Sequence, residues 1–235
     1  MSDDGLEIPE VGPWAKDKYH FLERYFSMFT TGMKNRWPER HYIDLFAGAG
    51  LARIRDSQEV VKASPLIAAT LTDPFTHLHL CDLSEVNCAA LRARLTPHVE
   101  ENRLRVYQGD SNQLIDTIVQ AIPDKALSIG LLDIFGTGNL AFSTVKRLAS
   151  KHLDFIILIP DRMDVERNRR AYYDENPESN LDLFFGHGGW RELNDLTGDR
   201  FRDAFRKIYE AGFRQLGYEY FGYTQYPRPW TQDAS

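Results

Sequence analysis

The chain has 235 residues, 43% of them hydrophobic and 26% charged, with a formal net charge of −6 at pH 7. This composition is typical of a globular protein that buries a sizeable core, and its acidity excludes a surface that is basic throughout. The two cysteines, Cys81 and Cys88, form no metal-ligand set, and no run approaches 18 apolar residues. We therefore expect a cytoplasmic protein with no metal site, no export signal and no membrane segment.

The chain begins with two segments of different character. Residues 1–12 carry no apolar periodicity and are expected to form a flexible lead. Residues 13–36 are predicted to form a long N-terminal helix, in which Pro13 suits the first helical position. Its apolar residues recur at helical spacing: Leu22, Tyr25, Phe26, Phe29 and Met33.

Residues 42–160 alternate short apolar runs with amphipathic stretches, which predicts βα units. Between the first two units, residues 53–62 are polar and indicate a loop or a short hairpin. Ser64 and Pro65 are expected to begin the next helix as N-cap and first-turn residue, and Ser84 is expected to cap the one after it. The pattern predicts an α/β fold with a doubly wound, mostly parallel sheet.

The first strand of this region ends in a glycine-rich turn, residues 42–50, with the pattern Asp44-x-Phe46-x-Gly48-x-Gly50. Glycines permit positive φ and let a ligand approach the backbone. A dinucleotide fingerprint requires a third glycine or alanine where this chain has Arg53, so NAD and FAD are disfavoured. The remaining pattern resembles the nucleotide loop of class I methyltransferases that use S-adenosyl-L-methionine (SAM).

An acidic residue also ends each of the next three apolar runs, at Asp82, Asp110 and Asp133. The carboxyl ends of parallel strands share one edge of a sheet, where ligands bind. We expect Asp82 to accept hydrogen bonds from ribose hydroxyls, Asp110 to accept one from an adenine amino group, and Asp44 to act near the amino-acid end of SAM through the loop. The structural alternative for each aspartate is a helix N-cap.

After the fifth strand the βα alternation stops. Residues 161–197 are interpreted as an insertion or cap, and residues 198–226 as a last helix and strand within a single domain, 1–235. Two prolines soon after Tyr226 argue against a further central strand. The C-terminal hairpin strand of a class I methyltransferase sheet is therefore expected to be absent, or this sequence stops short of it. Four arginines in the cap give the densest basic patch, interleaved with acids: Arg162, Arg167, Arg169 and Arg170.

Three short motifs together resemble the three-Cys-motif partner family (TcmP). They are Val11-Gly12-Pro13-Trp14-Ala15-Lys16, Ser64-Pro65-Leu66-Ile67-Ala68 and Leu132-Asp133-x-Phe135-Gly136. The likeness implies a class I methyltransferase fold, SAM as cofactor and a separate partner protein with a three-cysteine motif. The same arrangement is similar to that of bacterial ribosomal-RNA adenine-N6 methyltransferases, which implies methylation of an amine. One departure is Ile134, where the family usually has proline.

The resemblance assigns roles to individual residues. Asp133 is expected to accept a hydrogen bond from the substrate amine and Phe135 to stack on a base; alternatively, Asp133 caps a turn and Phe135 packs into the core. Cofactor contacts are expected from Asp44, Phe46, Gly48, Gly50, Asp82, Asp110 and Lys16. The predicted function is N-methylation of a nucleic-acid base bound through a local patch. The alternative is a non-catalytic SAM-binding partner of a three-cysteine-motif protein.

Overall fold

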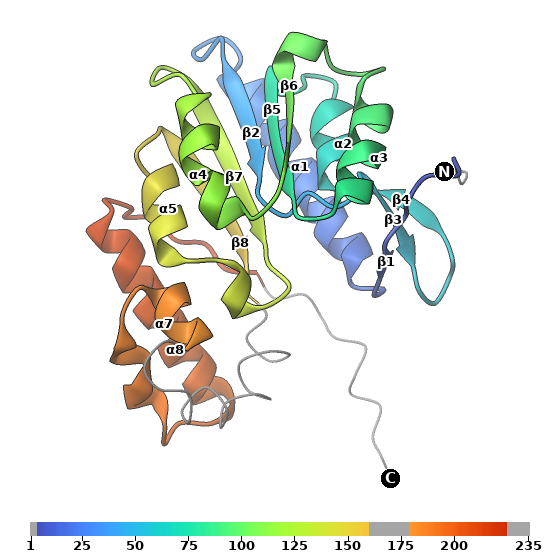
Figure 1. The fold of residues 1–235 in the computed structure, drawn as a ribbon. Helices are drawn as coiled ribbons and strands as arrows, with labels where there is room; N and C mark the ends of the chain where they lie inside the picture. The colour runs from blue at the N-terminus through green and yellow to red at the C-terminus, as the bar shows by residue number, and fades with distance from the viewer. Residues whose placement is uncertain (1–3, 160–178, 225–235) are drawn as a thin grey trace. The chain divides into compact units, whose positions relative to one another are not determined.

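The computed structural model describes residues 4–159 and 179–224 (Figure 1). Its main feature is a five-stranded parallel sheet with the order β6-β5-β2-β7-β8. The strands are β2 (Arg40–Asp44), β5 (His77–Asp82), β6 (Leu104–Gln108), β7 (Leu127–Asp133) and β8 (Leu153–Leu158). The predicted α/β fold with a parallel sheet is confirmed.

Helices cover both faces of this sheet. Helix α1 (Ala15–Met33) packs against α2 (Ser64–Ala69), and α2 packs against α3 (Glu85–Leu95). The Phe26 ring of α1 lies edge-on to Tyr42 of β2, with centroids 5.1 Å apart, so these helices cover the face that Tyr42 occupies. Helix α4 (Ser111–Gln120) leads from β6 back to β7, and the right-handed crossover rule places it on the opposite face, as Figure 1 shows.

The strand order reverses at β2. The chain steps outward from β2 to β5 and β6, and then returns to form β7 on the other side of β2. In this register Asp44 lies beside Leu80 of β5 and Leu131 of β7. Such a reversal opens a crevice beyond the carboxyl ends of the strands, which is where ligands bind in open α/β sheets. The glycine turn follows β2 directly and therefore lies at the switch point.

A second, three-stranded sheet follows the glycine turn. Strands β3 (Leu51–Ile54) and β4 (Val60–Lys62) form an antiparallel hairpin, the second of the two forms expected for this polar stretch. Strand β1 (Glu10–Val11) pairs in parallel with β3. The expectation of a flexible lead is therefore wrong for residues 9–11, because the Pro9 and Val11 carbonyls accept hydrogen bonds from the Arg53 and Arg55 N–H groups of the hairpin.

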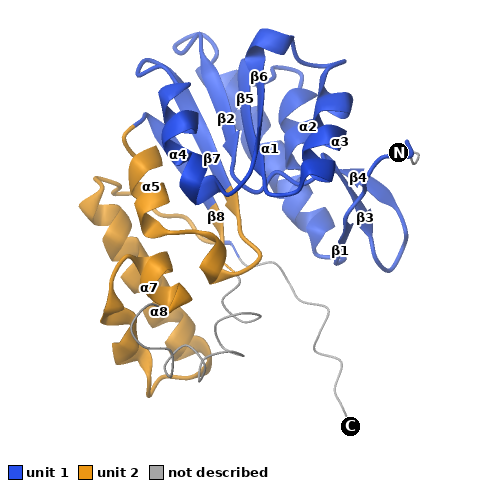
Figure 2. Ribbon diagram, in the orientation of Figure 1, with its two compact units in different colours: residues 1–131, 151–156, 224–235 blue, residues 132–150, 157–223 orange. Residues whose placement is uncertain are grey.

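The described residues fall into two compact units (Figure 2). Of the described residues, 4–131, 151–156 and 224 belong to the first unit, and 132–150, 157–159 and 179–223 belong to the second. The described residues also include three short 3-10 segments: η1 (Glu101–Arg103) in the first unit, and η2 (Thr137–Asn139) and η4 (Gly188–Leu193) in the second.

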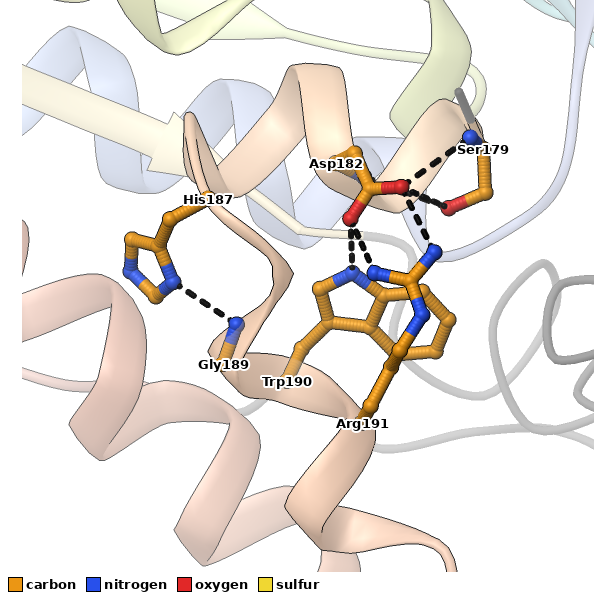
Figure 3. A network of polar contacts seen from close by, with 6 residues as sticks. All are labelled: Ser179, Asp182, His187, Gly189, Trp190 and Arg191. Atoms are coloured by element: carbon orange, nitrogen blue, oxygen red, sulfur yellow. Dashed lines mark hydrogen bonds and ion pairs between the residues drawn. The ribbon is translucent and has the colours of Figure 1, made fainter. Parts of the chain in front are cut away.

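The second unit has its own aromatic core, built from α5 (Phe142–Leu148), α7 (Asn180–Phe185) and α8 (Gly198–Gln215). Phe184 stacks on Tyr209 with ring centroids 4.4 Å apart, and both side chains are buried. A polar network centred on Asp182 joins α7 to η4 (Figure 3). Trp190, which belongs to this network, is 1% exposed and packs into the unit.

The segment expected to form a last strand, 218–226, is not a strand over residues 218–224, and residues 225 and 226 lie outside the described part of the chain. Helix α8 ends at Gln215; Gly217 follows with φ of +94°, and the Tyr218 N–H bonds to the Phe213 carbonyl. The Phe221 and Tyr223 rings then lie against two arginines of α8. These ring–cation contacts hold the segment along the helix instead of in a sheet.

Part of the predicted cap also lies outside the described residues. This holds for 161–178, which includes the four-arginine patch, whereas residues 179–197 form α7, η4 and their flanks. Among the helices that the structure describes, none combines the length and the apolar character needed to cross a membrane.

Candidate functional site: the glycine loop and its carboxylates

The turn after β2 contains two glycines in a left-handed conformation. Gly48 and Gly50 have φ of +63° and +85°, in the region that side-chain-bearing residues rarely adopt. A Cβ added at Gly48 would meet no atom within 4 Å, whereas one at Gly50 would meet Leu91 at 3.4 Å and Arg94 at 3.7 Å. Gly50 therefore packs against α3, while Gly48 faces open space and presents main-chain atoms there.

Asp44 supports this loop through hydrogen bonds made by its side chain. Its carboxylate is fully buried and accepts hydrogen bonds from the Tyr42 hydroxyl (2.7 Å), the Ser64 hydroxyl (2.8 Å) and the Phe46 N–H (3.1 Å). A buried carboxylate needs such donors. The role expected for Ser64 as N-cap of α2 is wrong: Ala63 is the N-cap, and the Ser64 side chain serves Asp44 instead.

Asp82, the last residue of β5, fastens the loop from the side. One carboxylate oxygen accepts the Gly48 N–H at 2.8 Å. The other accepts the Ser84 N–H at 2.9 Å and the Asn87 amide at 3.0 Å, at the start of α3, where Ser84 is the N-cap as predicted. Two carboxylate oxygens offer about four acceptor positions. Three are used by the chain, so Asp82 retains capacity for a ligand hydroxyl.

Asp110 lies next to Asp82, because the Gly109 N–H bonds to the Asp82 carbonyl at 3.0 Å. Its side chain is the N-cap of α4 and accepts the Asn112 N–H at 2.9 Å. Asp110 therefore has the geometry of the structural alternative, a helix N-cap. A capping carboxylate keeps a second oxygen, which leaves room for a role toward a ligand.

The two lysines near the start of α1 lie in different environments. Lys16, proposed as a cofactor contact, is exposed and pairs with Glu59, between β3 and β4. Lys18 is 3% exposed, with its ammonium 4.9 Å from the Trp14 ring centroid and 4.7 Å from that of Tyr19. The structure thus brings Asp44, Gly48, Asp82 and Asp110 together and gives Lys16 a partner outside this group.

Asp133 and Phe135 belong to the second unit, with Asp133 at the end of β7. Phe135 is 84% exposed, so the alternative that it packs into the core is wrong. Ile134, between them, is 5% exposed. A buried isoleucine here anchors the strand end, while the phenylalanine ring that follows is presented to solvent. An exposed aromatic ring of this kind is a stacking surface.

The segment after the glycine loop is a hairpin, which bears on the kind of ligand that the loop can bind. Dinucleotide-binding folds place a helix N-terminus directly after the turn, where its N–H groups bind the pyrophosphate. Here β3 and β4 intervene, and α2 begins only at Ser64. The loop therefore lacks, directly after its turn, the helix N-terminus that binds the pyrophosphate in those folds. This agrees with the inference drawn from Arg53.

Both cysteines lie close to this site without nucleophilic character. Cys81 and Cys88 are buried free thiols. Burial raises the pKa of the Cys81 thiol to about 12 and also raises the pKa of Cys88, so neither forms a thiolate near neutral pH. Within the described ranges, no three His, Cys, Asp or Glu side chains are grouped as metal ligands would be.

Sequence reasoning missed three supporting residues of the loop, Ser64, Asn87 and Arg94. Ser64 was assigned to a helix cap, and Asn87 was not singled out. A sequence signal exists for Asn87, because a polar residue in the first turn of the helix after Asp82 can reach back to that carboxylate. Arg94 lies in the last turn of α3, and nothing local reveals its partners.

Comparison of the chain with protein-family models finds no match, and comparison with curated proteins finds none either.

The two carboxylates at neighbouring strand ends are expected to differ in their effect on stability. Asp110→Ala removes a helix cap and should lower the free energy of unfolding by about 1 kcal/mol. Asp82→Ala removes three hydrogen bonds to a charged group and should lower it by about 2 kcal/mol, given partial exposure. Urea unfolding of both variants measures the difference. Equal losses would contradict the role of Asp82 in fastening the loop.

Proposed function

We propose that the chain is a SAM-dependent methyltransferase that methylates an amino group of a nucleic-acid base. The observation that carries the proposal is the loop at the switch point. Its Gly48 backbone is open to a ligand and is fixed by Asp82, which retains acceptor capacity. The resemblance to the three-Cys-motif partner family supports the same cofactor.

The residues around the loop suit a nucleoside bearing a charged amino acid. Asp82 and Asp110 end neighbouring strands and would accept hydrogen bonds from ribose hydroxyls and an adenine amino group. Asp44 would act indirectly, because it is fully buried and fixes the Phe46 N–H. The hairpin after the loop suits a ligand without phosphates. Lys16 has the weakest support in this set, since its ammonium pairs with Glu59.

Bound SAM supplies a methyl group on a sulfonium that an amine can attack. The protein then has mainly to position an uncharged amine in line with that methyl group. Asp133 would accept one amine N–H, which orients the nitrogen lone pair, and Phe135 would stack on the base through its exposed ring. Ile134 gives this segment less φ restraint than proline would.

Calorimetry with S-adenosylhomocysteine, run beside NADH, tests the cofactor. We expect the wild-type chain to bind the former and not the latter, and Asp82→Ala to bind about tenfold more weakly, because a charged hydrogen-bond partner is lost. Tighter binding of NADH would overturn the assignment. Wild-type binding of neither ligand at millimolar concentration would do the same.

Transfer of tritiated methyl groups from SAM to total RNA and DNA tests the reaction. Asp133→Ala should lower the rate roughly tenfold to a hundredfold, since one positioning hydrogen bond to the amine is lost. Phe135→Leu, which keeps bulk without a π-face, should raise KM more than it lowers kcat. Phe135→Tyr serves as the matched control and should behave as wild type. Label that enters only protein or small molecules would eliminate the nucleic-acid substrate.

A second candidate is a non-catalytic SAM-binding partner of a three-cysteine-motif protein. It is favoured by Ile134 and by the sheet itself, in which β6 and β8 are edge strands and the described residues add no antiparallel strand beyond β8. Exposed strand edges invite pairing with another chain. Binding of S-adenosylhomocysteine together with undetectable transfer to any acceptor, and complex formation with such a protein in light scattering, would favour this candidate.

A further inference from the structure

The segment before α1 is tied to the glycine loop through one arginine. The Arg94 guanidinium, on the last turn of α3, donates two hydrogen bonds to the Asp4 carboxylate, at 2.8 and 2.6 Å. It also donates to the Glu7 carbonyl at 2.7 Å and to the Ala49 carbonyl at 2.6 Å. Ala49 lies between Gly48 and Gly50. One side chain therefore joins residues 4–7 to the loop.

The contact with Ala49 fixes the direction of a peptide group. In a trans peptide the C=O and N–H point to opposite sides, so holding the Ala49 carbonyl also sets the Gly50 N–H. Glycines flank this segment, and their wide conformational freedom makes rotation of the peptide planes easy. Asp82 holds the Gly48 N–H in the same way from the other side. The two contacts together specify which main-chain groups the loop presents.

The hydrogen bond from Arg94 to the Ala49 carbonyl depends on Asp4. The Arg94 side chain is 5% exposed, and a charge that is so deeply buried needs a partner. Asp4 provides it, and the hydrogen bonds from Arg94 lower the pKa of that carboxyl to about 2, so it stays ionised in the physiological range. Without Asp4, the guanidinium gains by turning toward water and releasing the Ala49 carbonyl. Backbone pairing of Pro9 and Val11 with the hairpin holds the rest of the segment in place.

We propose that Arg94 is a positioning residue for the cofactor loop and that it acts only while residues 4–7 are docked, so that the chain's own N-terminal segment regulates the cofactor site. This rests on the proposed function, since the ligand of the loop is taken to be SAM. Coupling of this kind is reciprocal: if docking favours ligand binding, ligand binding favours docking to the same extent.

Hydrogen–deuterium exchange of the full chain, with and without S-adenosylhomocysteine, tests the proposal. Asp4→Asn should speed exchange in a peptide covering residues 45–52 and weaken affinity for the ligand about tenfold. Ligand added to the wild-type chain should slow exchange in residues 4–11, a distant effect that a merely structural contact would not produce. Asp4→Glu should restore both properties.

Glu10→Gln is the matched control, because it removes the same charge from an exposed position in the same segment and should change neither measurement. Loop exchange in Asp4→Asn equal to that of the wild type would overturn the proposal, as would unchanged affinity or the absence of a ligand effect on residues 4–11. If the wild-type chain does not bind S-adenosylhomocysteine, the proposed cofactor is wrong, and the ligand-free exchange still decides whether Arg94 positions the loop.

Discussion

Acidification between about pH 5.5 and about pH 4 is expected to lower the free energy of unfolding by roughly 2.7 kcal/mol per pH unit, because two histidines bind protons only when the chain unfolds. His41 of β2 and His79 of β5 are 1% and 2% exposed. Burial lowers the pKa of each to about 3, from an ordinary value near 6.5. Each contributes about 1.4 kcal/mol per pH unit while its unfolded form is protonated and its folded form is not.

The geometry of the cluster explains why the charged forms are excluded. His41 Nδ1 and His79 Nε2 are 3.0 Å apart, and His77 stacks on His41 with centroids 4.3 Å apart. Charge on any ring would repel the next one. The charged and titratable neighbours are Glu39, whose carboxylate is 3.5 Å from His41 Nε2, Tyr107, which stacks beside His79, and the Arg103 and Arg105 side chains. Glu39 is half-exposed, so water screens its attraction.

The sign of the effect follows from these pKa values. Above about pH 6.5 both folded and unfolded histidines are neutral and stability is complete; it is lost as the pH falls toward the folded value of about 3. Asp4 has a pKa of about 2 in the folded state against an ordinary value of 3.8, so its own contribution to stability is lost as the pH falls from about 4 toward 2. The two histidines therefore account for most of the loss of unfolding free energy above about pH 4.

Urea unfolding across this range measures the slope. His79→Gln keeps a neutral polar side chain and should reduce the slope to about half, because one of the two excluded protons is removed. His98→Gln alters an exposed histidine and should leave the slope unchanged. If His79→Gln retained the wild-type slope, the stacked histidines would not be the source of acid sensitivity.

The sheet was predictable because its signals are local. Each strand is a short apolar run that ends in Asp or a turn, and parallel strands buried on both faces require such runs. The loop was predictable for the same reason, since Gly48 and Gly50 follow a strand and adopt the positive φ that glycine permits. The hairpin after the loop was also indicated, although its strands are only four and three residues long.

The remaining features depend on partners far along the chain. Asp4 and Arg94 are separated by 90 residues, and nothing near Asp4 reveals the contact, so the segment was taken for a flexible lead. His77 and His79 share a face by strand alternation, but their approach to His41 requires the register of β2 against β5. The segment after α8 has strand-like residues, and ring–arginine contacts with α8 determine its course instead.

In the second unit, Asp182→Ala is expected to lower the free energy of unfolding by about 2–3 kcal/mol, a value discounted because Asp182 is 18% and Arg191 36% exposed. The Asp182 carboxylate accepts the Trp190 indole N–H at 2.9 Å and a two-pronged contact from Arg191 (Figure 3). It also closes a capping box with Ser179 at the start of α7. Hydrogen bonds from Arg191, and then from Trp190 and Ser179, hold the pKa of Asp182 well below its usual range.

The loss arises because the variant removes the carboxylate that accepts the buried Trp190 N–H. Trp190 is 1% exposed, so its N–H has no access to water once the carboxylate is gone, whereas the half-buried Arg191 head can turn outward. Arg191→Ala should therefore cost less, about 1 kcal/mol, since Asp182 keeps its contacts with Trp190 and Ser179. The near-ultraviolet circular dichroism of the tryptophans reports how firmly the indole is fixed. This signal should therefore fall more in Asp182→Ala than in Arg191→Ala.

Urea unfolding of Asp182→Ala, Arg191→Ala and Asp195→Ala measures these differences, with Asp195 as an exposed acidic control in the same unit. Asp195→Ala is expected to lie within about 0.5 kcal/mol of the wild type. An Asp182→Ala variant as stable as this control, or less affected than Arg191→Ala, would show that the carboxylate does not hold η4 against α7. Asp182→Asn separates shape from charge: its amide oxygen can still accept from Trp190, so the near-ultraviolet signal should persist while stability falls by part of the alanine loss.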